Sequence, residues 1–65
     1  MSQDAVFAAK GLALAALDLT YGDVGREQST FHPDGSVEFV FFSSRGKKRL
    51  LAHVKVNPDD SVEVL

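Results

Sequence analysis

The side chains best suited to chemistry lie between residues 29 and 34. A hydroxyl nucleophile, a general base and a carboxylate are supplied there by Ser29 or Thr30, His32 and Asp34, which are the groups of a hydrolytic triad. In such triads the groups come from separate parts of a fold and converge on one point. Residues that follow one another along a strand and a turn point in different directions. The pattern therefore predicts a turn capped by polar side chains, with no catalytic residue and no enzyme.

The two histidines are candidate metal ligands. His32 and His53, with Asp34 or Asp59, offer nitrogen and oxygen atoms to an ion. A stable zinc site needs three or four ligands, usually in a recognisable spacing, and two isolated histidines do not provide it. The chain also lacks cysteine and a glycine-rich phosphate loop. We expect no metal, no cofactor and no small-molecule substrate, and we interpret the histidines as a surface residue and a cross-strand partner of Glu38.

Basic charge is concentrated around Gly46, in a loop that carries Arg45, Lys47, Lys48 and Arg49. Residues 45–65 have five basic and three acidic side chains, whereas residues 1–44 have two basic and six acidic ones. Such a loop can bind the phosphates of a nucleic acid, contact a protein partner, or remain solvated and keep the hairpin soluble. Only Phe42 is close enough to add base stacking, so nucleic-acid binding is the alternative prediction.

The length of 65 residues limits the chain to a single domain, 1–65, which buries only about 60% of its unfolded surface. Without cysteine, a dense core or association with another chain must add stability. The apolar run from Ala5 to Leu19 is too short to span a bilayer, and it is interrupted by Lys10 and Asp18. Asp4 stands where a secretory signal has basic residues. These features predict a cytoplasmic protein that does not enter a membrane.

The N-terminal stretch predicts a helix over about residues 3–20. Ser2 is a good N-cap, Asp4 favours the first turn, and the alanines and leucines that follow have high helix propensity. Gly22 is expected to end the helix in a left-handed conformation. Gly11 is expected to allow a neighbour to approach the helix backbone closely, which would offset its low propensity.

A period-two pattern follows the helix. It predicts strands at 26–32, 36–43, 48–56 and 61–65, separated by turns rich in proline, aspartate and glycine. Because every connection is short, an antiparallel meander is the simplest topology. The predicted fold class is α+β, with an N-terminal helix packed on a four-stranded antiparallel sheet (αββββ). Two turns share the pattern Pro-Asp-x-Ser-Val-Glu at an offset of 25 residues, which we interpret as convergence on one favourable turn.

The expected core face of the sheet is apolar, and it comprises Phe31, Val37, Phe39, Phe41, Leu50, Ala52, Val54, Val56, Val62 and Val64. The opposite face carries Val40, Phe42 and Leu51 among charged residues. On the helix, a stripe of small and leucine side chains is expected to face the sheet, namely Ala5, Ala8, Ala9, Leu12, Ala15, Ala16 and Leu19. A second apolar side then remains, made of Val6, Phe7, Leu14 and Leu17 around Lys10.

One sheet layer cannot cover both sides of this helix, which leads to a functional prediction. The expected partner-binding residues are Phe7, Lys10, Leu14, Leu17, Val40, Phe42 and Leu51, and the partner is another protein or a second copy of the chain. In the open alternative, Phe7 and Leu14 reach round the helix into the core while Lys10 extends to water. We predict a non-enzymatic interaction module, an inhibitor or adaptor that masks a protein partner. Its size would suit a phage or mobile-element product that blocks, for example, a nuclease complex. The alternative is a nucleic-acid-binding accessory protein that uses the basic loop.

Overall fold

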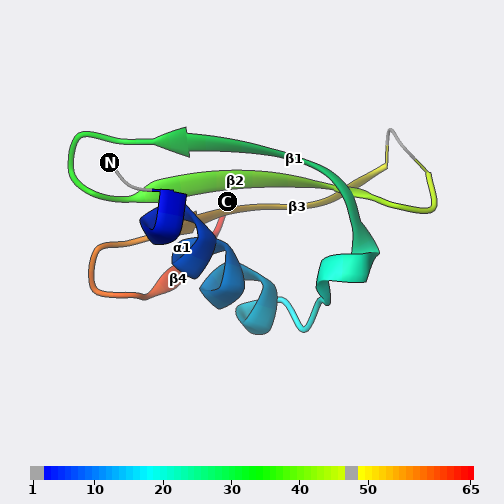
Figure 1. The fold of residues 1–65 in the computed structure, drawn as a ribbon, viewed down its shortest axis with the longest axis horizontal. Coiled ribbons are helices and arrows are strands. Elements are labelled where there is room, and N and C mark those ends of the chain that lie inside the picture. The colour runs from blue at the N-terminus through cyan, green and yellow to red at the C-terminus, as the bar shows by residue number, and fades with distance from the viewer. Residues whose placement is uncertain (1–2, 47–48) are drawn as a thin grey trace.

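The computed structural model describes residues 3–46 and 49–65. Helix α1 (Gln3–Ala16) is followed by a 3₁₀ helix (Tyr21–Asp23) and by strands β1 (Val24–Phe31), β2 (Val37–Ser43), β3 (Leu50–Val56) and β4 (Val62–Val64). The strands form one antiparallel sheet in the order β1-β2-β3-β4, and α1 lies across one face of it (Figure 1). The predicted αββββ fold is therefore confirmed. The proposed N-cap Ser2 lies outside the described residues.

Helix α1 ends four residues before the predicted position. Asp18 adopts a left-handed conformation with a φ of 56°. Its N–H donates to the carbonyl of Ala15 at 3.2 Å, and the N–H of Leu19 donates to the carbonyl of Leu14 at 2.9 Å. These two bonds define a Schellman motif. The expectation that Gly22 terminates the helix is wrong, because Asp18 takes the left-handed position earlier.

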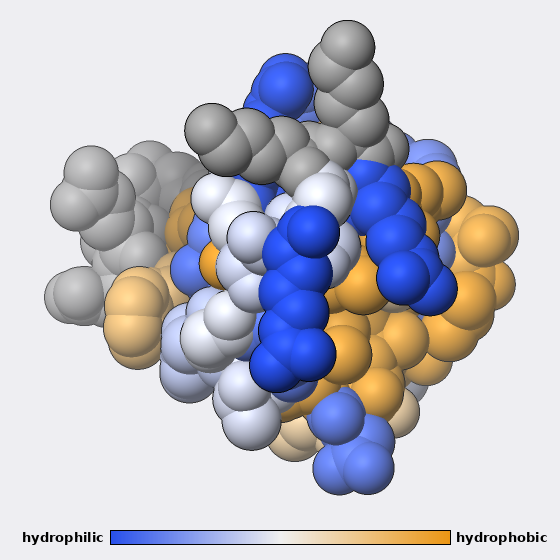
Figure 2. Space-filling model, turned by 90° about the vertical axis from the view of Figure 1, so that its right-hand side faces the viewer, coloured by the Kyte–Doolittle hydropathy of each residue, from blue (hydrophilic) through white to orange (hydrophobic). Residues whose placement is uncertain are grey.

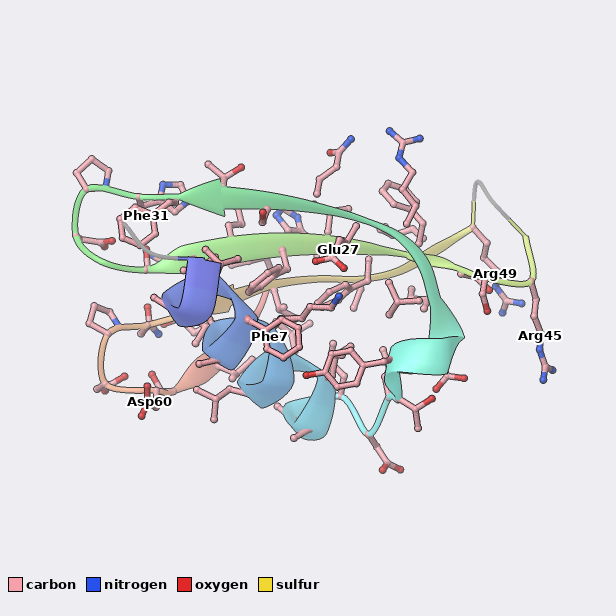
Figure 3. The ribbon with its side chains drawn as sticks, viewed as in Figure 1. Phe7, Glu27, Phe31, Arg45, Arg49 and Asp60 are labelled. Atoms are coloured by element: carbon pink, nitrogen blue, oxygen red, sulfur yellow. The ribbon has the colours of Figure 1, made fainter. Side chains whose placement is uncertain are left out.

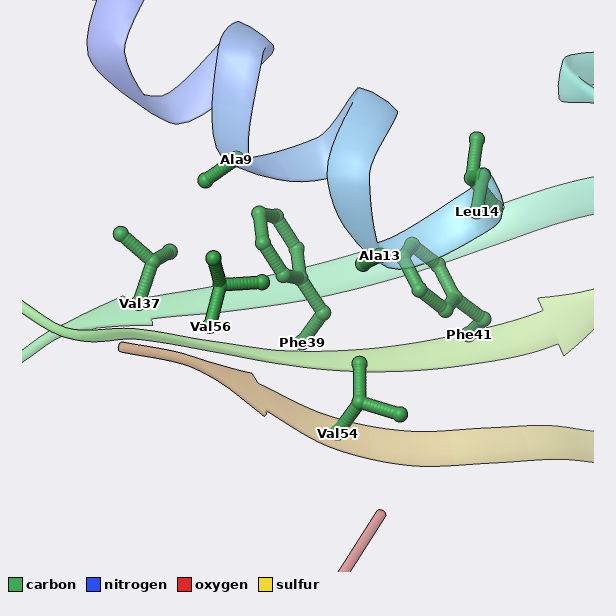
Figure 4. Close-up of a cluster of buried hydrophobic side chains, with 8 residues drawn as sticks. All are labelled: Ala9, Ala13, Leu14, Val37, Phe39, Phe41, Val54 and Val56. Carbon is green, nitrogen blue, oxygen red and sulfur yellow. The ribbon is translucent and has the colours of Figure 1, made fainter. Parts of the chain in front are cut away.

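The core lies between α1 and the inner face of β2 and β3. Its buried side chains are Ala9, Ala13, Leu14, Val37, Phe39, Phe41, Val54 and Val56 (Figure 4). The rings of Phe39 and Phe41 stack with centroids 5.4 Å apart. The assignment of the inward-facing valines and phenylalanines of these strands is confirmed.

The side of α1 that faces the sheet differs from the predicted stripe. Ala9 is buried as expected, but the other inward positions are Ala13 and Leu14, with Val6 and Leu17 packed against them. The exposed residues include Ala5, Ala8, Leu12, Ala15 and Ala16. Burying leucine and valine removes more apolar area from water than burying alanine. The helix therefore turns its larger apolar side chains, in place of the predicted alanine-rich stripe, toward the sheet.

A β-bulge reverses the two leucines at the start of β3. Phe41 pairs with Ala52 and Phe42 pairs with Leu50, so Leu51 is the extra residue. Leu51 packs against the core, whereas Leu50 lies beside Phe42 on the outer face and is exposed. The predicted alternation is wrong here because a bulge shifts every preceding residue of the strand to the other face.

The two proline turns have the same hydrogen bonds. In the first, Asp34 Oδ1 accepts from the N–H of Ser36 at 2.9 Å and from its hydroxyl at 2.6 Å. In the second, Asp59 Oδ1 accepts from the N–H of Ser61 at 3.0 Å and from its hydroxyl at 2.6 Å. The capped turn that the sequence predicts around residues 32–36 is confirmed. The repeated sequence pattern thus corresponds to a repeated turn geometry.

The turns differ at the residue that adopts positive φ. Gly35 has a φ of 91°, and Asp60 takes the equivalent position with a φ of 71°. Because a Cβ disfavours this conformation, we expect Asp60→Gly to raise the free energy of unfolding by about 0.5–1 kcal/mol. Urea unfolding measures the change. Asp59→Gly is the matched control and should destabilise, since it removes the acceptor for Ser61; an Asp60→Gly variant no more stable than wild type would contradict the assignment.

Candidate functional site

Strand β1 is an open edge of the sheet. It pairs only with β2 along its length, and no other strand within residues 3–46 and 49–65 borders its far side. Helix α1 packs on β2, β3 and β4 and leaves β1 at its margin (Figure 1). Every residue of β1 after Val24 is exposed. An eight-residue strand is therefore available for pairing with another chain.

The peptide groups of β1 that face the open edge can be assigned from the hairpin. The N–H of His32 donates to the carbonyl of Ser36 at 2.9 Å, which marks this pair as hydrogen-bonded. Because such pairs alternate along antiparallel strands, the even-numbered residues of 26–30 direct their peptide groups toward β2. Glu27, Ser29 and Phe31 therefore present their N–H and C=O groups at the open edge.

A second bulge bends the first residues of β1. Val24 pairs with Ser43 and Arg26 pairs with Phe42, so Gly25 is the extra residue. A Cβ on Gly25 would lie 2.6 Å from the Cα of Ser44 and 2.9 Å from the carbonyl oxygen of Ser43. Only glycine fits this approach without moving backbone atoms. The bulge carries the chain from the 3₁₀ helix onto the sheet edge.

An exposed aromatic pair lies beside this edge. The rings of Phe7 and Tyr21 stack with centroids 5.9 Å apart, although 63% of Phe7 and 51% of Tyr21 are exposed. The Tyr21 hydroxyl lies 3.4 Å from the position that a Cβ on Gly11 would occupy. The neighbour at Gly11 is therefore the Tyr21 side chain of the 3₁₀ helix, at about an ordinary van der Waals distance, and the expected close approach that would require glycine is not found there.

Charged residues join the aromatic pair to β1. Lys10 Nζ lies 5.3 Å from the centroid of the Tyr21 ring and forms an ion pair with Glu27, which points from β1 toward α1 (Figure 3). Phe31, 48% exposed, stands at the other end of β1. We call Phe7, Lys10, Tyr21, Glu27 and Phe31 the α1–β1 surface.

A shallow hollow continues the α1–β1 surface beyond Phe31. Its volume is about 260 Å³. Besides Phe31, its lining includes Ala8 and Leu12 of α1 and Pro58 of the turn between β3 and β4. The lining is largely apolar, so this end of the surface favours aliphatic side chains over charged ones.

Of the predicted helix residues, the structure places two on this surface. Phe7 and Lys10 lie together beside β1, as described above. Leu14 is only 2% exposed and belongs to the core, and Leu17 packs against it. The expectation that Leu14 and Leu17 present an exposed face is wrong, because the helix turns its larger aliphatic side chains toward the sheet.

The predicted sheet patch lies on the opposite side of the molecule. Val40 and Phe42 are half-buried on the outer face, and the guanidinium carbon of Arg26 lies 5.4 Å from the centroid of the Phe42 ring. Leu51 is absent from this patch, because the bulge in β3 turns it inward. The sheet patch is therefore smaller than predicted and separate from the α1–β1 surface.

The histidines of the outer face share one carboxylate. Glu38 Oε1 lies 3.0 Å from His32 Nε2, and Glu38 Oε2 is hydrogen-bonded to His53 Nε2. The prediction that one histidine pairs with Glu38 across strands is confirmed, but the other histidine, expected to be a surface residue, bonds to the same carboxylate. Among the described residues, no group of three histidine, aspartate or glutamate side chains is arranged to hold a metal ion.

Carboxylates in the turns and on the outer face make stability depend on pH. Hydrogen bonds from the Ser36 hydroxyl and N–H lower the pKa of Asp34 below its ordinary 3.8. Those from the Ser61 hydroxyl and N–H lower the pKa of Asp59. Hydrogen bonds from His53, the larger effect, and from His32 lower the pKa of Glu38 below its ordinary 4.5. A carboxylate whose pKa is lower in the folded state than in the unfolded state stabilises the fold at pH values above its unfolded-state pKa. This stabilisation is lost as the pH falls through the folded-state pKa.

We therefore expect the free energy of unfolding to be level from about pH 7 to pH 5 and to fall below about pH 4. Urea unfolding across this range measures it. In the Asp34→Asn/Glu38→Gln variant the acid decline should be shallower, since two of the responsible carboxylates are gone. Parallel pH profiles for the variant and the wild type would show that these groups do not control acid stability.

The basic loop lies at the far end of the β2–β3 hairpin. Arg45 and Arg49 are exposed there and point away from the sheet (Figure 3), while Lys47 and Lys48 lie outside the described residues. This end of the molecule has strongly hydrophilic side chains next to hydrophobic ones (Figure 2). Arg45 and Asp23 line the same hollow of about 250 Å³, so a carboxylate partly offsets the positive charge.

Tyr21, Glu27 and the open edge of β1 were not among the residues predicted for the site from the sequence. One signal was available. Glu27 and Ser29 occupy the inward positions of β1, opposite Phe41 and Phe39, and polar residues at inward positions indicate a strand that the helix does not cover.

Comparison with known proteins gives no relative: no family model, no curated protein and no solved structure matches this chain. No helix among the described residues is long and apolar enough to cross a membrane.

Proposed function

We propose that this chain is a non-enzymatic protein-interaction module, an inhibitor or adaptor that acts by covering part of a protein partner. The observation that carries the proposal is the exposure of β1 along the side that α1 does not cover. An extended segment of a partner can pair with such an edge through main-chain hydrogen bonds. The proposal includes a cytoplasmic location, on the charge pattern around the apolar N-terminal run.

The side chains beside β1 support this function. Aromatic residues are enriched among those that dominate binding energy, since they bury a large area with few rotatable bonds. Phe31 lies at one end of the α1–β1 surface, and Phe7 lies on α1 between Phe31 and Glu27 in the view of Figure 3. The Lys10–Glu27 ion pair joins α1 to β1. Apolar anchors give affinity, whereas a neutralised charge pair adds specificity.

The groups that first suggested a triad are divided between the two faces of the sheet and the turn. Ser29 lies on the helix side opposite Phe39, whereas Thr30 lies on the outer face opposite Glu38, and Glu38 bonds to His32 there. Asp34 accepts hydrogen bonds from Ser36 in the turn. The carboxylate bonded to the imidazole is therefore Glu38, and Asp34 serves the turn.

The function is tested by capturing partners from an extract of the source cells with the immobilised chain and then measuring the affinity of the purified partner. We expect Phe7→Ala/Phe31→Ala to weaken that affinity at least about 100-fold. Two aromatic side chains that become buried by the partner contribute about 1.5–2 kcal/mol each. Leu50→Ala/Val64→Ala is the control, since these side chains are 56% and 71% exposed but lie outside the α1–β1 surface.

The control pair should retain wild-type affinity. If both pairs weaken binding equally, or if neither does, the α1–β1 surface is not the binding surface. Arg45→Ala/Arg49→Ala tests the alternative use of the basic loop: a partner lost only in this variant, together with salt-dependent binding of DNA or RNA by the wild type, would favour nucleic-acid binding.

A further inference from the structure

The sequence of β1 itself specifies a binding partner for its open edge. We infer that this partner is β1 of a second copy of the chain, so that two four-stranded sheets join into one continuous antiparallel sheet. The inference rests on the proposed use of the α1–β1 surface for binding protein, and it names the occupant.

Residues 26–30 of the edge lack the usual features that prevent strands from pairing. Edge strands are commonly protected by proline, by lysine, by an inward-pointing charge or by a β-bulge. The bulge of β1 lies at Gly25, before these residues. Strand β1 reads Val-Gly-Arg-Glu-Gln-Ser-Thr-Phe and contains neither proline nor lysine. Its inward-pointing charge, Glu27, is neutralised by Lys10. The edge is therefore compatible with a neighbouring strand.

Symmetry limits the possible registers. A two-fold axis perpendicular to the sheet keeps both helices on one face and pairs residues that share a face. An axis at Glu27 would place two carboxylates directly opposite each other, which is destabilising. An axis at Ser29 would set Glu27 against the ring of Phe31. An axis at Gln28 avoids both problems.

With Gln28 on the axis, the side chains and peptide groups both match. Glu27 lies opposite Ser29 of the second copy, and Arg26 lies opposite Thr30, so no like charges face each other. The peptide groups of Glu27 and Ser29 already point to the open edge, and they meet as a hydrogen-bonded pair. Gln28 then forms a non-hydrogen-bonded pair with its own copy.

This arrangement also accounts for the exposed aromatic side chains. The two α1–β1 surfaces would lie on the same face, on either side of the central β1 pair. Phe7, Tyr21 and Phe31 of both copies would then border a shared groove, which explains why three large rings remain about half exposed in a single chain. The small net charge of −2 per chain adds little repulsion.

Cysteine cross-linking tests the register, since the chain has no cysteine of its own. In the Gln28→Cys variant the two new thiols would face each other, with Cα atoms about 4.5 Å apart, within the range of a disulfide. We expect rapid disulfide-linked dimers on mild oxidation. In Thr30→Cys, on the same face, the thiols would be about 14 Å apart along the strands and should not cross-link.

Sedimentation equilibrium of the cysteine-free protein tests association. The wild-type mass should approach twice 7.0 kDa with rising concentration. Ser29→Pro removes an N–H that faces the open edge and leaves the bonds to β2 in place. It should raise the dimer dissociation constant at least about 30-fold, and an unchanged circular dichroism spectrum would show that it folds.

A wild-type chain that stays monomeric at about 1 mM, or equal cross-linking of the two cysteine variants, would overturn the inference. If the wild-type chain is monomeric and Phe7→Ala/Phe31→Ala weakens binding of the captured partner, only the inference of a second copy is overturned. If the chain is a dimer and the captured partner binds Phe7→Ala/Phe31→Ala as well as wild type, the strand pairing stands and the proposed function is overturned.

Discussion

Phe39→Ala is expected to leave the chain largely unfolded at 25 °C. Phe39 is fully buried and stacks on Phe41 in the centre of the core. Truncating a buried phenylalanine costs about 3–5 kcal/mol, while a domain of this size has only about 3–5 kcal/mol of stability in total. Circular dichroism and urea unfolding measure the loss.

Phe31→Ala is the matched control for this substitution. Phe31 was expected on the same core face of the sheet, but it is about half exposed on the edge strand. Its replacement should cost less than about 1.5 kcal/mol. If Phe31→Ala destabilised the fold as much as Phe39→Ala, Phe31 would be a core residue and the α1–β1 surface would lose one of its anchors.

Gly25→Ala should produce the second largest loss, about 3 kcal/mol. The added methyl would overlap the Cα of Ser44 and the carbonyl oxygen of Ser43, and both are backbone atoms that cannot rotate away. The bulge would have to open, and the start of β1 would separate from the end of β2. Urea unfolding at about pH 7, within the level range of the pH profile, measures the change.

Gly46→Ala provides the comparison for Gly25→Ala. A Cβ on Gly46 would meet only the Cβ of Arg49, at 3.7 Å, an ordinary contact. We expect a change within about 0.5 kcal/mol for this half-buried loop position, where the added methyl has room. Equal effects of the two substitutions would mean that glycine at position 25 is not required by the close approach of Ser43 and Ser44.

The αββββ order could be predicted because local signals agreed. The alanine-rich stretch favours a helix, and the turns at Pro33 and Pro58 separate strands with a clear two-residue period. The same turns recur in the structure, with Asp34 and Asp59 as the acceptors. Short-range chemistry of this kind needs no knowledge of the tertiary fold.

The face of the helix and the register of β3 could not be predicted, because each depends on packing. Apolar residues lie on most sides of α1, so the helical periodicity is compatible with several buried faces. The structure buries the larger Leu14 in place of most of the alanine stripe. At the start of β3 a bulge exchanged the sides of Leu50 and Leu51. A period-two pattern carries no signal for a bulge.

Part of the candidate site followed from counting apolar residues. The prediction that one sheet layer cannot shelter the whole helix led to Phe7 and Lys10, which do lie on the α1–β1 surface. The larger feature, the open β1 edge, arises from the lateral position of α1 on the sheet. That position is set by the contacts of α1 with β2, β3 and β4.

Residue-resolved amide hydrogen exchange of β1 tests most directly whether its edge is a binding surface. In dilute protein, the amides of Glu27, Ser29 and Phe31 should exchange fast, while those of Gln28 and Thr30, which face β2, exchange slowly. When the concentration is raised or a captured partner is added, the amides of Glu27 and Ser29 should become protected, whereas Phe31 would lie opposite the bulged Gly25 of a second copy. Equal protection of all five amides in dilute protein, or fast exchange at Glu27 and Ser29 under every condition, would contradict the account.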